Sequence, residues 1–597
     1  MVDTAEEAPA ANGGGEQRPS QRITPYLKAG SRPGSAVTPC SAGKPLTPAS
    51  SGKFAERQQA GTVVATLNQQ IEATAQCEAM ELDASTSGRP GGCELRILGA
   101  PLSHDERYMV DRIEDRVAYC ERRILALSAE VPSAADGEAA EGEPGLHPVG
   151  LACQQPAIFA GRIVCDTEEG RLNAASLLLE GSQQHSEGMR VRLDVSKCAA
   201  GVRLFPGQTV LVQGTNPSGH CVVASEVLPG MPAPMPATPL PELAAAVAAH
   251  GGRGLSVVVA AGPYTLADDL AYEPLAALLD YCRAQRPNVL LLAGPFVDDQ
   301  HPRVADGQLD VLFEELYQSA VVEPIRAFVA SAEGAGTRVL LLPAVRDAHH
   351  HPVFPQPPLD EVAGAPAVTP LANPTTLALD EVVLGVSSAD WLLGVTSQEL
   401  AEGPAAAGDR MAALAGHLLS QRSYFPMFPM PLGACFDSTK SHALEMPLTP
   451  DLLITPSQLA PFAKLVPVAR GGLEGPPQLA GNVVCINPGR LAKGSSGEAA
   501  VPGGGPSLPL PLMHPCQFAL PVVPYRFAGP PLPGSQVAPL HMCILRRTRR
   551  QQKLRPVEQR PPMRRCPTVW MSAAAWRSDA SERGSSGMHW FAWSTIH

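Results

Sequence analysis

Short apolar runs alternate with amphipathic segments from residue 255 to residue 494. The runs are rich in valine and leucine and lack a polar alternation, which is typical of strands buried on both faces of a sheet. Apolar positions at helical spacing predict helices at Glu273–Gln285 and Leu309–Ala330. Strands that alternate with helices predict an α/β domain over 255–494. The predicted strands are Leu255–Ala261, Asn288–Ala293, Arg338–Leu342, Val382–Val386, Asp451–Ile454 and Asn482–Ile486.

A different pattern occupies residues 155–228, where short β-rich runs are separated by turn residues. Five strands of this size are typical of a small closed barrel and indicate an OB-fold. Because Phe159 and Phe205 are its only phenylalanines, tyrosines or tryptophans, a structural or protein-binding barrel is favoured over one that stacks single-stranded bases. The runs are Ile158–Cys165, Ser176–Glu180, Met189–Val195, Thr209–Gly214 and Cys221–Val227.

Residues 103–130 predict one amphipathic helix. Ser103 and Glu106 have the spacing of a capping box, and apolar residues then recur on one helical face. We expect this helix to cover an edge of the barrel that follows it. The apolar positions are Met109, Ile113, Val117, Cys120, Ile124 and Leu127.

The 62 prolines and 54 glycines gather outside these elements. Such stretches cannot bury enough apolar surface to offset the entropy of ordering. We therefore expect a disordered linker over 1–95, a connector over 229–254 and a disordered or mis-annotated tail over 495–597. Thr24, Thr38 and Thr47 each precede a proline in the linker and are candidate phosphorylation sites for proline-directed kinases.

The overall charge limits the range of functions. A formal net charge of −12 and a pI near 5.7 argue against a protein whose main role is to coat nucleic acid. The 14 cysteines form no C-x-x-C pair, and no signal peptide is evident, so we expect a reducing, intracellular location. No apolar run has the length of a membrane span, so no membrane association is expected.

The loops that follow the predicted strands have the layout of a calcineurin-like metallophosphoesterase. Such enzymes share the sequence motifs D-x-H, G-D-x-x-D, G-N-H-E and G-H-x-H, and the side chains of these motifs hold two metal ions. In this chain each motif is altered. The residues at the corresponding, degenerate positions are Gly262, Pro263, Tyr264, Gly294, Pro295, Asp298, Arg346, Asp347, His349, His350, Asn487, Pro488, Gly489 and Arg490. Further strand-end loops are expected at Thr396-Ser397 and Thr455-Pro456-Ser457.

These replacements predict a phosphoesterase fold without its chemistry. Proline offers no ligand atom, and the guanidinium of Arg346 would repel a dication. The run His349 to His351 is the one feature that favours a metal, but neighbouring loop histidines cannot all face one ion. We expect an Arg346–Asp347 ion pair and hydrogen-bonded loop histidines instead, with no catalytic residue, metal ion or cofactor.

Several sequence motifs, which follow one another in order along the chain, resemble those of the B subunit family of the DNA polymerase alpha–primase complex. They are Arg346-Asp347-Ala348 followed by three histidines and Pro-x-x-Pro-Gln-Pro-Pro, then 421–429, 447–459 and 485–491. The likeness extends from about 155 to 494. After Gly494 a closing pair of strands expected from the family is missing, and an Arg-rich stretch, Arg546–Arg565, and four of the five tryptophans follow without apolar periodicity. A mis-annotated tail is therefore favoured over a basic, aromatic tail that binds nucleic acid.

The resemblance implies a non-catalytic nuclear scaffold. In this family the barrel and the inactive phosphoesterase domain dock together and hold the C-terminal zinc-bearing module of the polymerase alpha catalytic subunit. That subunit links to the primase subunits, and DNA is reached mainly through the complex. Two alternatives stay open: an active metallophosphoesterase, and an OB-fold protein that binds single-stranded nucleic acid.

Overall fold

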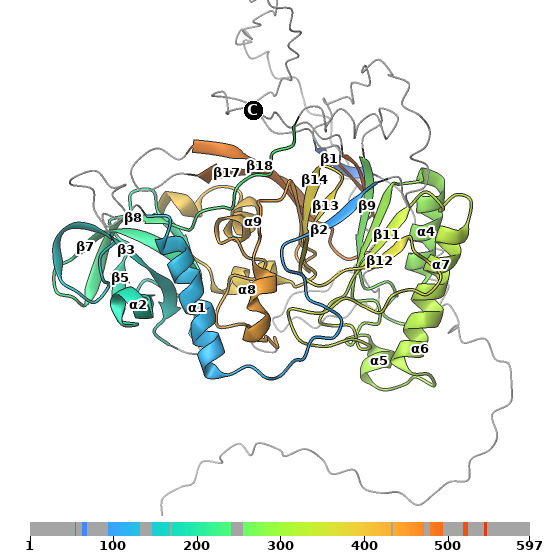
Figure 1. Cartoon of the computed structure of the whole chain (residues 1–597), viewed down its shortest axis with the longest axis horizontal. Helices are drawn as coiled ribbons and strands as arrows, with labels where there is room; N and C mark the ends of the chain where they lie inside the picture. Colours follow the sequence, from blue (N-terminus) through green and yellow to red (C-terminus); the bar gives the residue numbers. More distant parts are fainter. Residues whose placement is uncertain are drawn as a thin grey trace, which may run out of the picture. The chain divides into compact units, whose positions relative to one another are not determined.

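The computed structural model describes residues 54, 63–67, 93–131, 146–167, 170–239, 255–431, 434–470, 478–492, 517–522 and 542–545. All of them belong to one compact unit, which spans Thr47–His597. This unit contains a barrel and a larger α/β domain (Figure 1).

The barrel closes in the strand order β3-β4-β5-β8-β7. Its strands enclose a core that includes Phe159, Leu179, Val191 and Val212. The pairing of β5 with β8 is parallel, and the other pairings are antiparallel. The five expected strands are confirmed, as is the OB-type barrel. The bounds are β3 Cys153–Cys165, β4 Leu177–Glu180, β5 Arg190–Asp194, β7 Thr209–Asn216 and β8 Cys221–Leu228, with the short helix α2 at Gln183–Ser186.

The α/β domain contains two sheets. The seven-stranded sheet has the order β1-β20-β19-β9-β10-β11-β12, and β9, β10, β11 and β12 are parallel. Its strands are β1 Val63–Leu67, β20 Met542–Leu545, β19 Gln517–Val522, β9 Leu255–Ala261, β10 Val289–Ala293, β11 Arg338–Leu342 and β12 Val368–Pro370. The six-stranded sheet is β17 Phe462–Arg470, β18 Gln478–Asn487, β16 Leu452–Ile454, β14 Val382–Val386, β13 Thr375–Leu379 and β2 Leu95–Leu98.

The two sheets pack face to face, and helices cover their outer faces. Val257, Leu291 and Leu340 of one sheet share a core with Leu384 and Ile454 of the other. The helices beside β9, β10 and β11 are α4 Glu273–Gln285, α6 Phe313–Tyr317, the π-helical turn η4 Gln318–Val322 and α7 Glu323–Ala330. The six-stranded sheet carries α8 Trp391–Gln398 and α9 Arg410–Ser420. The result is a four-layer α/β/β/α arrangement (Figure 1). Short elements α5 Pro302–Ala305, η5 Gly403–Ala406 and η6 Ser438–Leu444 lie in connecting segments.

The six strands and two helical regions predicted for this domain are confirmed, with ends shifted by a few residues. The helical region predicted at Leu309–Ala330 begins at Phe313 and contains a π-helical turn. Strands β12, β13 and β17 were not predicted. β12 has only three residues and β12 and β17 contain proline, while β13 begins with two threonines, so each gave a weaker apolar signal.

Short strands are described within both ends of the chain, where the sequence predicts disorder. β1 lies within 1–95, and β19 and β20 lie within 495–597. β19 pairs with β9, β20 pairs with β19, and β1 pairs with β20, all antiparallel. The surrounding proline and glycine hid these short apolar runs from a composition argument. Thr24, Thr38, Thr47 and Arg546–Arg565 lie outside the described residues.

The predicted helix over 103–130 is shorter than expected. Helix α1 spans Ile113–Ser128, and its capping interaction is an Asp115 carboxylate that accepts from the Arg112 N–H at 2.8 Å. The backbone of Met109 has a φ of 62°, which a right-handed helix cannot include. Ser103 still donates to Glu106, at 3.4 Å, but in a non-helical segment.

Only the second half of the expected apolar face of α1 is buried. Cys120, Ile124 and Leu127 are buried, whereas Ile113 and Val117 are exposed. The helix packs against β3 and β7 of the barrel and against η6 of the α/β domain. It therefore lies at the contact between the two parts rather than on one edge of the barrel.

The connector is described as far as residue 239. It runs against the α/β domain, since the Met231 carbonyl accepts from Arg422 at 2.6 Å and the Ala233 carbonyl accepts from Thr449 at 2.6 Å. Residues 240–254 lie outside the described residues.

Candidate functional site

The loops after β9 and β10 approach each other closely. The Gly262 N–H donates to the Ala293 carbonyl and the Gly294 N–H donates to the Leu342 carbonyl, both at 2.8 Å. A Cβ atom on Gly262 would collide with the Pro295 carbonyl, and one on Gly294 would collide with the Asp347 carboxylate. Glycine is required at both positions by this proximity.

Tyr264 is a core residue of this region. Its ring stacks on Phe296 with a centroid distance of 5.3 Å, and its hydroxyl donates to the Ala293 carbonyl at 3.0 Å. Burial and the nearby Asp347 raise the pKa of the Tyr264 hydroxyl well above its ordinary range. The peptide bonds before Pro263 and Pro295 are both cis.

Asp347 is fully engaged by backbone. Its carboxylate accepts from the N–H groups of Phe296, Val297 and Ala344, the last two at 3.1 and 2.8 Å. Burial raises the pKa of this carboxyl to about 7, against the backbone N–H groups, which favour the charged form. Asp347 therefore joins the loops after β10 and β11 and has a structural role.

Arg346 pairs with Asp298, not with Asp347. Its Nη2 lies 2.5 Å from both Asp298 oxygens, and its Nε lies 3.6 Å from Asp299. The expected Arg346–Asp347 pair is wrong because the Asp347 side chain turns inward to the backbone N–H groups. Burial and the Asp298 charge raise the pKa of Asp299, while burial and the Arg346 charge lower the pKa of Arg490.

His349 and His350, the two histidines of the predicted site, differ in their hydrogen bonding. The imidazole Nε2 of His350 lies 3.0 Å from the Pro357 carbonyl, as expected of a hydrogen-bonded loop histidine. His349 contradicts that expectation, because neither ring nitrogen has a hydrogen-bond partner although its side chain is only 2% exposed. Its ring stacks on Tyr317 at 4.0 Å. Burial lowers the pKa of His349 to about 4 and also lowers the pKa of His350.

The loop after β18 closes the group. Asn487 accepts from the N–H groups of Ser457 and Gly489, both at 2.9 Å, and the Leu491 N–H donates to the Ala261 carbonyl at 2.7 Å. Pro488 and Arg490 complete this loop. The loops after β9, β10, β11 and β18 thus meet at one edge, as the sequence indicated. We call residues 262–264, 294–298, 346–350 and 487–490 the strand-end cluster.

One of the further predicted strand-end loops lies elsewhere. Thr396 and Ser397 lie in α8 and not in a strand-end loop, because β14 ends at Val386 and α8 begins at Trp391. Among the described residues, no group of three or more His, Cys, Asp or Glu side chains is placed to hold a metal ion.

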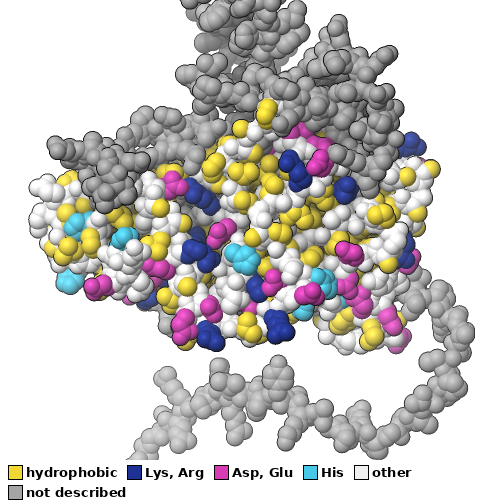
Figure 2. All heavy atoms as spheres, in the orientation of Figure 1, with side chains coloured by type: hydrophobic (Ala, Val, Ile, Leu, Met, Phe, Trp, Pro, Cys, Tyr) yellow, Lys and Arg dark blue, Asp and Glu magenta, His cyan; other side chains and the backbone are white. Residues whose placement is uncertain are grey.

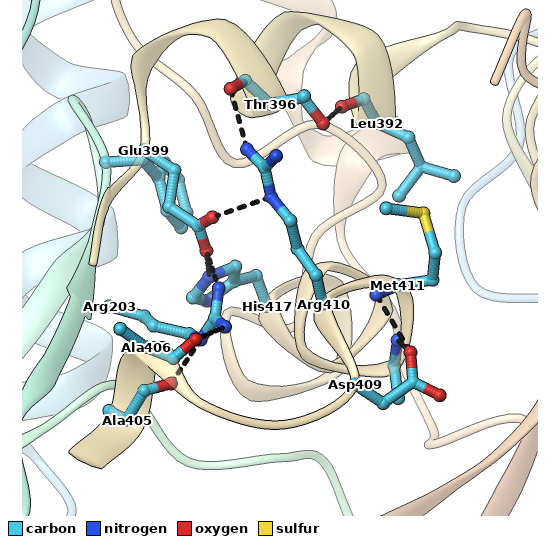
Figure 3. A network of polar contacts seen from close by, with 12 residues as sticks. Arg203, Leu392, Thr396, Glu399, Ala405, Ala406, Asp409, Arg410, Met411 and His417 are labelled. Atoms are coloured by element: carbon cyan, nitrogen blue, oxygen red, sulfur yellow. Dashed lines mark hydrogen bonds and ion pairs between the residues drawn. The ribbon is translucent and has the colours of Figure 1, made fainter. Parts of the chain in front are cut away.

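A polar network that sequence reasoning missed joins the barrel to the α/β domain (Figure 3). The barrel-side strand β6, Val202–Leu204, pairs with β15, Leu400–Glu402, in a two-stranded sheet. Beside it, Arg203 donates to the Glu399 carboxylate at 3.0 Å and to the Ala405 carbonyl at 2.7 Å. His417 lies 3.3 Å and Arg410 lies 3.6 Å from the same carboxylate. We call Arg203, Glu399, Arg410 and His417 the interdomain network.

The central carboxylate of this network is charged. Burial favours the neutral form of Glu399, but the hydrogen bonds from His417 and Arg203 outweigh it and hold its pKa below the ordinary value. Its side chain is 2% exposed, against 11% for Arg203. A buried, paired charge of this kind fixes the relative position of the groups around it.

Gln421 extends the contact. Its amide donates to the carbonyls of Thr209 and Pro229 at 2.8 and 2.7 Å, and its carbonyl accepts from the Thr209 N–H at 2.9 Å. Arg123 of α1 donates to the same Gln421 oxygen and to the Gly207 carbonyl, at 2.7 and 3.1 Å. One side chain from each of α1 and the α/β domain therefore secures the start of β7.

These features define a class of protein in which a closed five-stranded barrel is fixed by buried polar contacts to a four-layer α/β domain. The family model for the B subunit of DNA polymerases alpha and epsilon matches residues 257–464, and the model for the OB domain of the DNA polymerase alpha B subunit matches residues 142–230. The chain belongs to the DNA polymerase alpha B subunit family.

Individual relatives support this assignment. The DNA polymerase alpha B subunit of Mus musculus is 30% identical over 486 residues, which cover 80% of this chain and 74% of the relative. The Rattus norvegicus protein is 30% identical over 473 residues, 78% and 71% of the two chains. The Schizosaccharomyces pombe protein is 33% identical over 359 residues, 57% and 58% of the two chains.

Proposed function

We propose that this chain is a non-catalytic scaffold within the DNA polymerase alpha complex. As a member of the B subunit family it is an accessory subunit in DNA replication. Its barrel and α/β domain would together hold the C-terminal zinc-bearing module of the polymerase catalytic subunit, which links to the primase subunits. Its place of action would be the nucleus.

The Arg346–Asp298 pair is the observation that carries this proposal. In a phosphoesterase-like fold the strand-end edge would hold two metal ions between carboxylates and imidazoles. Here a guanidinium occupies that edge and neutralises Asp298, while Asp347 is engaged by three backbone N–H groups. The residues present do not fit a metal pair, so we derive no hydrolytic step for the α/β domain.

The surface and the barrel favour contact with DNA mainly through the complex. Phe159 and Phe205 are both fully buried, so neither phenylalanine of the barrel can stack a base. Basic and acidic side chains are interspersed over the described residues visible in Figure 2, which does not favour phosphate binding along that face. No helix among the described residues has both the length and the apolar character needed to cross a bilayer.

Copurification tests the scaffold role. We would coexpress the chain with the polymerase catalytic subunit, either intact or without its C-terminal module, and separate the products by size exclusion. A stable complex is expected only with the intact subunit. Equal recovery with the truncated subunit would refute the proposed docking module.

A second measurement tests the absence of phosphoesterase chemistry. Metal analysis of the purified chain and a manganese-supplemented phosphodiesterase assay should give less than one equivalent of metal and no turnover. Two equivalents of metal, with activity that is lost in His349→Ala or His350→Ala but kept in the distant Glu323→Gln, would contradict the proposal.

A further inference from the structure

The beginning of helix α1 and the two residues that lie shortly before it expose a row of apolar side chains. The row consists of Met109, Val110, Ile113 and Val117, whose exposed fractions run from 47% for Val117 to 78% for Ile113. These are four of the eleven large apolar side chains that are exposed among the described residues. Single exposed apolar residues are ordinary on a protein surface, whereas a contiguous patch marks an interaction site. The row lies at the lower end of α1 in Figure 1.

The exposed row continues a seam that is buried further along the same helix. From Ile113 the apolar residues follow at intervals of four, three, four and three, at Val117, Cys120, Ile124 and Leu127. This spacing keeps them on one face and is typical of a helix that packs along another helix. The last three are buried in the cores of the α/β domain and the barrel. The open half of the seam is therefore continuous with the contact between the two parts.

The open half is held in place by polar contacts to the α/β domain and within the segment. The Met109 N–H donates to the buried Asp437 carboxylate, just before η6, at 3.1 Å. Arg116 pairs with Asp111 at 2.9 Å. A surface that is already fixed loses less conformational entropy when a partner docks on it. The exposed row is thus preorganised for contact.

The size of the row argues against a second copy of this chain as its occupant. At about 100 Å² of apolar surface for each side chain, the exposed fractions offer roughly 250 Å². A stable interface needs about 800 Å² on each partner. Two copies that met through this row alone would supply about a third of that area. The row must belong to a larger interface that continues onto the barrel or the α/β domain.

We propose that the exposed row of α1 seats a helix of the polymerase catalytic subunit's C-terminal module. This inference rests on the proposed function, in which the barrel and the α/β domain hold that module jointly. A partner held by both parts must cross the contact between them, and α1 packs there against β3 and β7 on one side and η6 on the other. A helix is the segment that fits, because a seam with four-three spacing accepts side chains that recur at the same spacing.

Binding of the intact catalytic subunit to the full chain tests the proposal. The double variant Ile113→Gln, Val117→Gln replaces two apolar seam residues by a good helix former, so α1 keeps its structure. The affinity for the catalytic subunit should fall at least about tenfold. Leu312→Gln is the matched control and should bind like the parent chain, because Leu312 is also exposed but precedes α6, which lies far from α1 in Figure 1. Thermal unfolding within about 2 °C of the parent shows that each variant is folded.

Crosslinking identifies what covers the row. A photoreactive amino acid at position 117 should crosslink to the C-terminal module, and one at position 312 should not. If the parent chain does not bind the catalytic subunit, the proposed function fails and this inference fails with it. If the parent binds, three results overturn this inference alone: equal binding by the double variant, an equal loss in Leu312→Gln, or a crosslink from position 117 to a second copy of this chain.

Discussion

Replacement of Glu399 by glutamine should weaken the attachment of the barrel to the α/β domain. The glutamine keeps the shape and one acceptor oxygen but removes the charge that faces Arg203, Arg410 and His417. Glu399 is 2% exposed and Arg203 is 11% exposed, so solvent cannot replace the lost carboxylate. Removal of one partner from a buried ion pair costs about 3–5 kcal/mol, and because one acceptor oxygen remains, the expected loss is about 3 kcal/mol.

Thermal unfolding of the purified chain provides the measurement. For domains of this size each kcal/mol corresponds to roughly 2–4 °C, so the midpoint should fall by roughly 6–12 °C. Limited proteolysis should also cut 229–254 faster in the variant, because the barrel is held less firmly. Glu323→Gln is the matched control: its carboxylate is 58% exposed and paired with Arg326, so its loss should stay within about 0.5 kcal/mol.

A double-mutant cycle separates the network from general damage. Arg203→Met and Glu399→Gln should each destabilise the chain, and the double variant should lose less than their sum by at least about 1 kcal/mol, since the two side chains interact directly. Strict additivity, or a Glu399→Gln midpoint within about 2 °C of the parent, which is less than about 1 kcal/mol, would refute the reasoning.

Three other outcomes are expected. Burial lowers the pKa of His349 in the folded chain from 6.5 to about 4. The unfolded chain therefore binds a proton first, and the free energy of unfolding falls as the pH drops from about 6.5 to about 4. His349→Phe should reduce this pH dependence by up to about 3 kcal/mol in acid denaturation curves, and curves identical to those of the parent chain would contradict the prediction. Truncation after residue 494 removes β19 and β20 and exposes the edge of β9, so the product should aggregate more and unfold at a lower temperature; a truncated chain as stable as the parent would show that these strands contribute nothing. Gln421→Leu leaves the Thr209 N–H and carbonyl without their partner and should cost about 1–3 kcal/mol by denaturant unfolding, whereas loss of the exposed Gln318 amide in Gln318→Ala should be small.

The sequence predicted the interior of the fold better than its contacts. Strands such as β9 and β10 are continuous apolar runs whose burial on both faces leaves little choice of structure. The ion-pair partner of Arg346 could not be predicted from an apolar pattern of this kind. Asp347 follows it directly, but the pairing depends on which way each side chain turns after β11, and Asp298 comes from another loop.

Glu399 had no signal in the sequence. It lies in an ordinary polar stretch, and its burial arises only when β6 reaches β15 from a distant part of the chain. The start of α1 was misplaced for a similar reason. The apolar spacing continued back to Met109, while the backbone there adopts a left-handed conformation that no pattern of side chains reveals.

The shared β6–β15 sheet has a consequence for how the protein is made. The last barrel strand ends at Leu228, about 170 residues before β15 begins at Leu400. At a synthesis rate of about 5–20 residues per second, the ribosome needs roughly 10–35 seconds to deliver the partner of β6. A newly made barrel must pass that interval with β6 unpaired and Arg203 without its carboxylate. The short length of β6, three residues, limits the template that this open edge offers to other nascent chains.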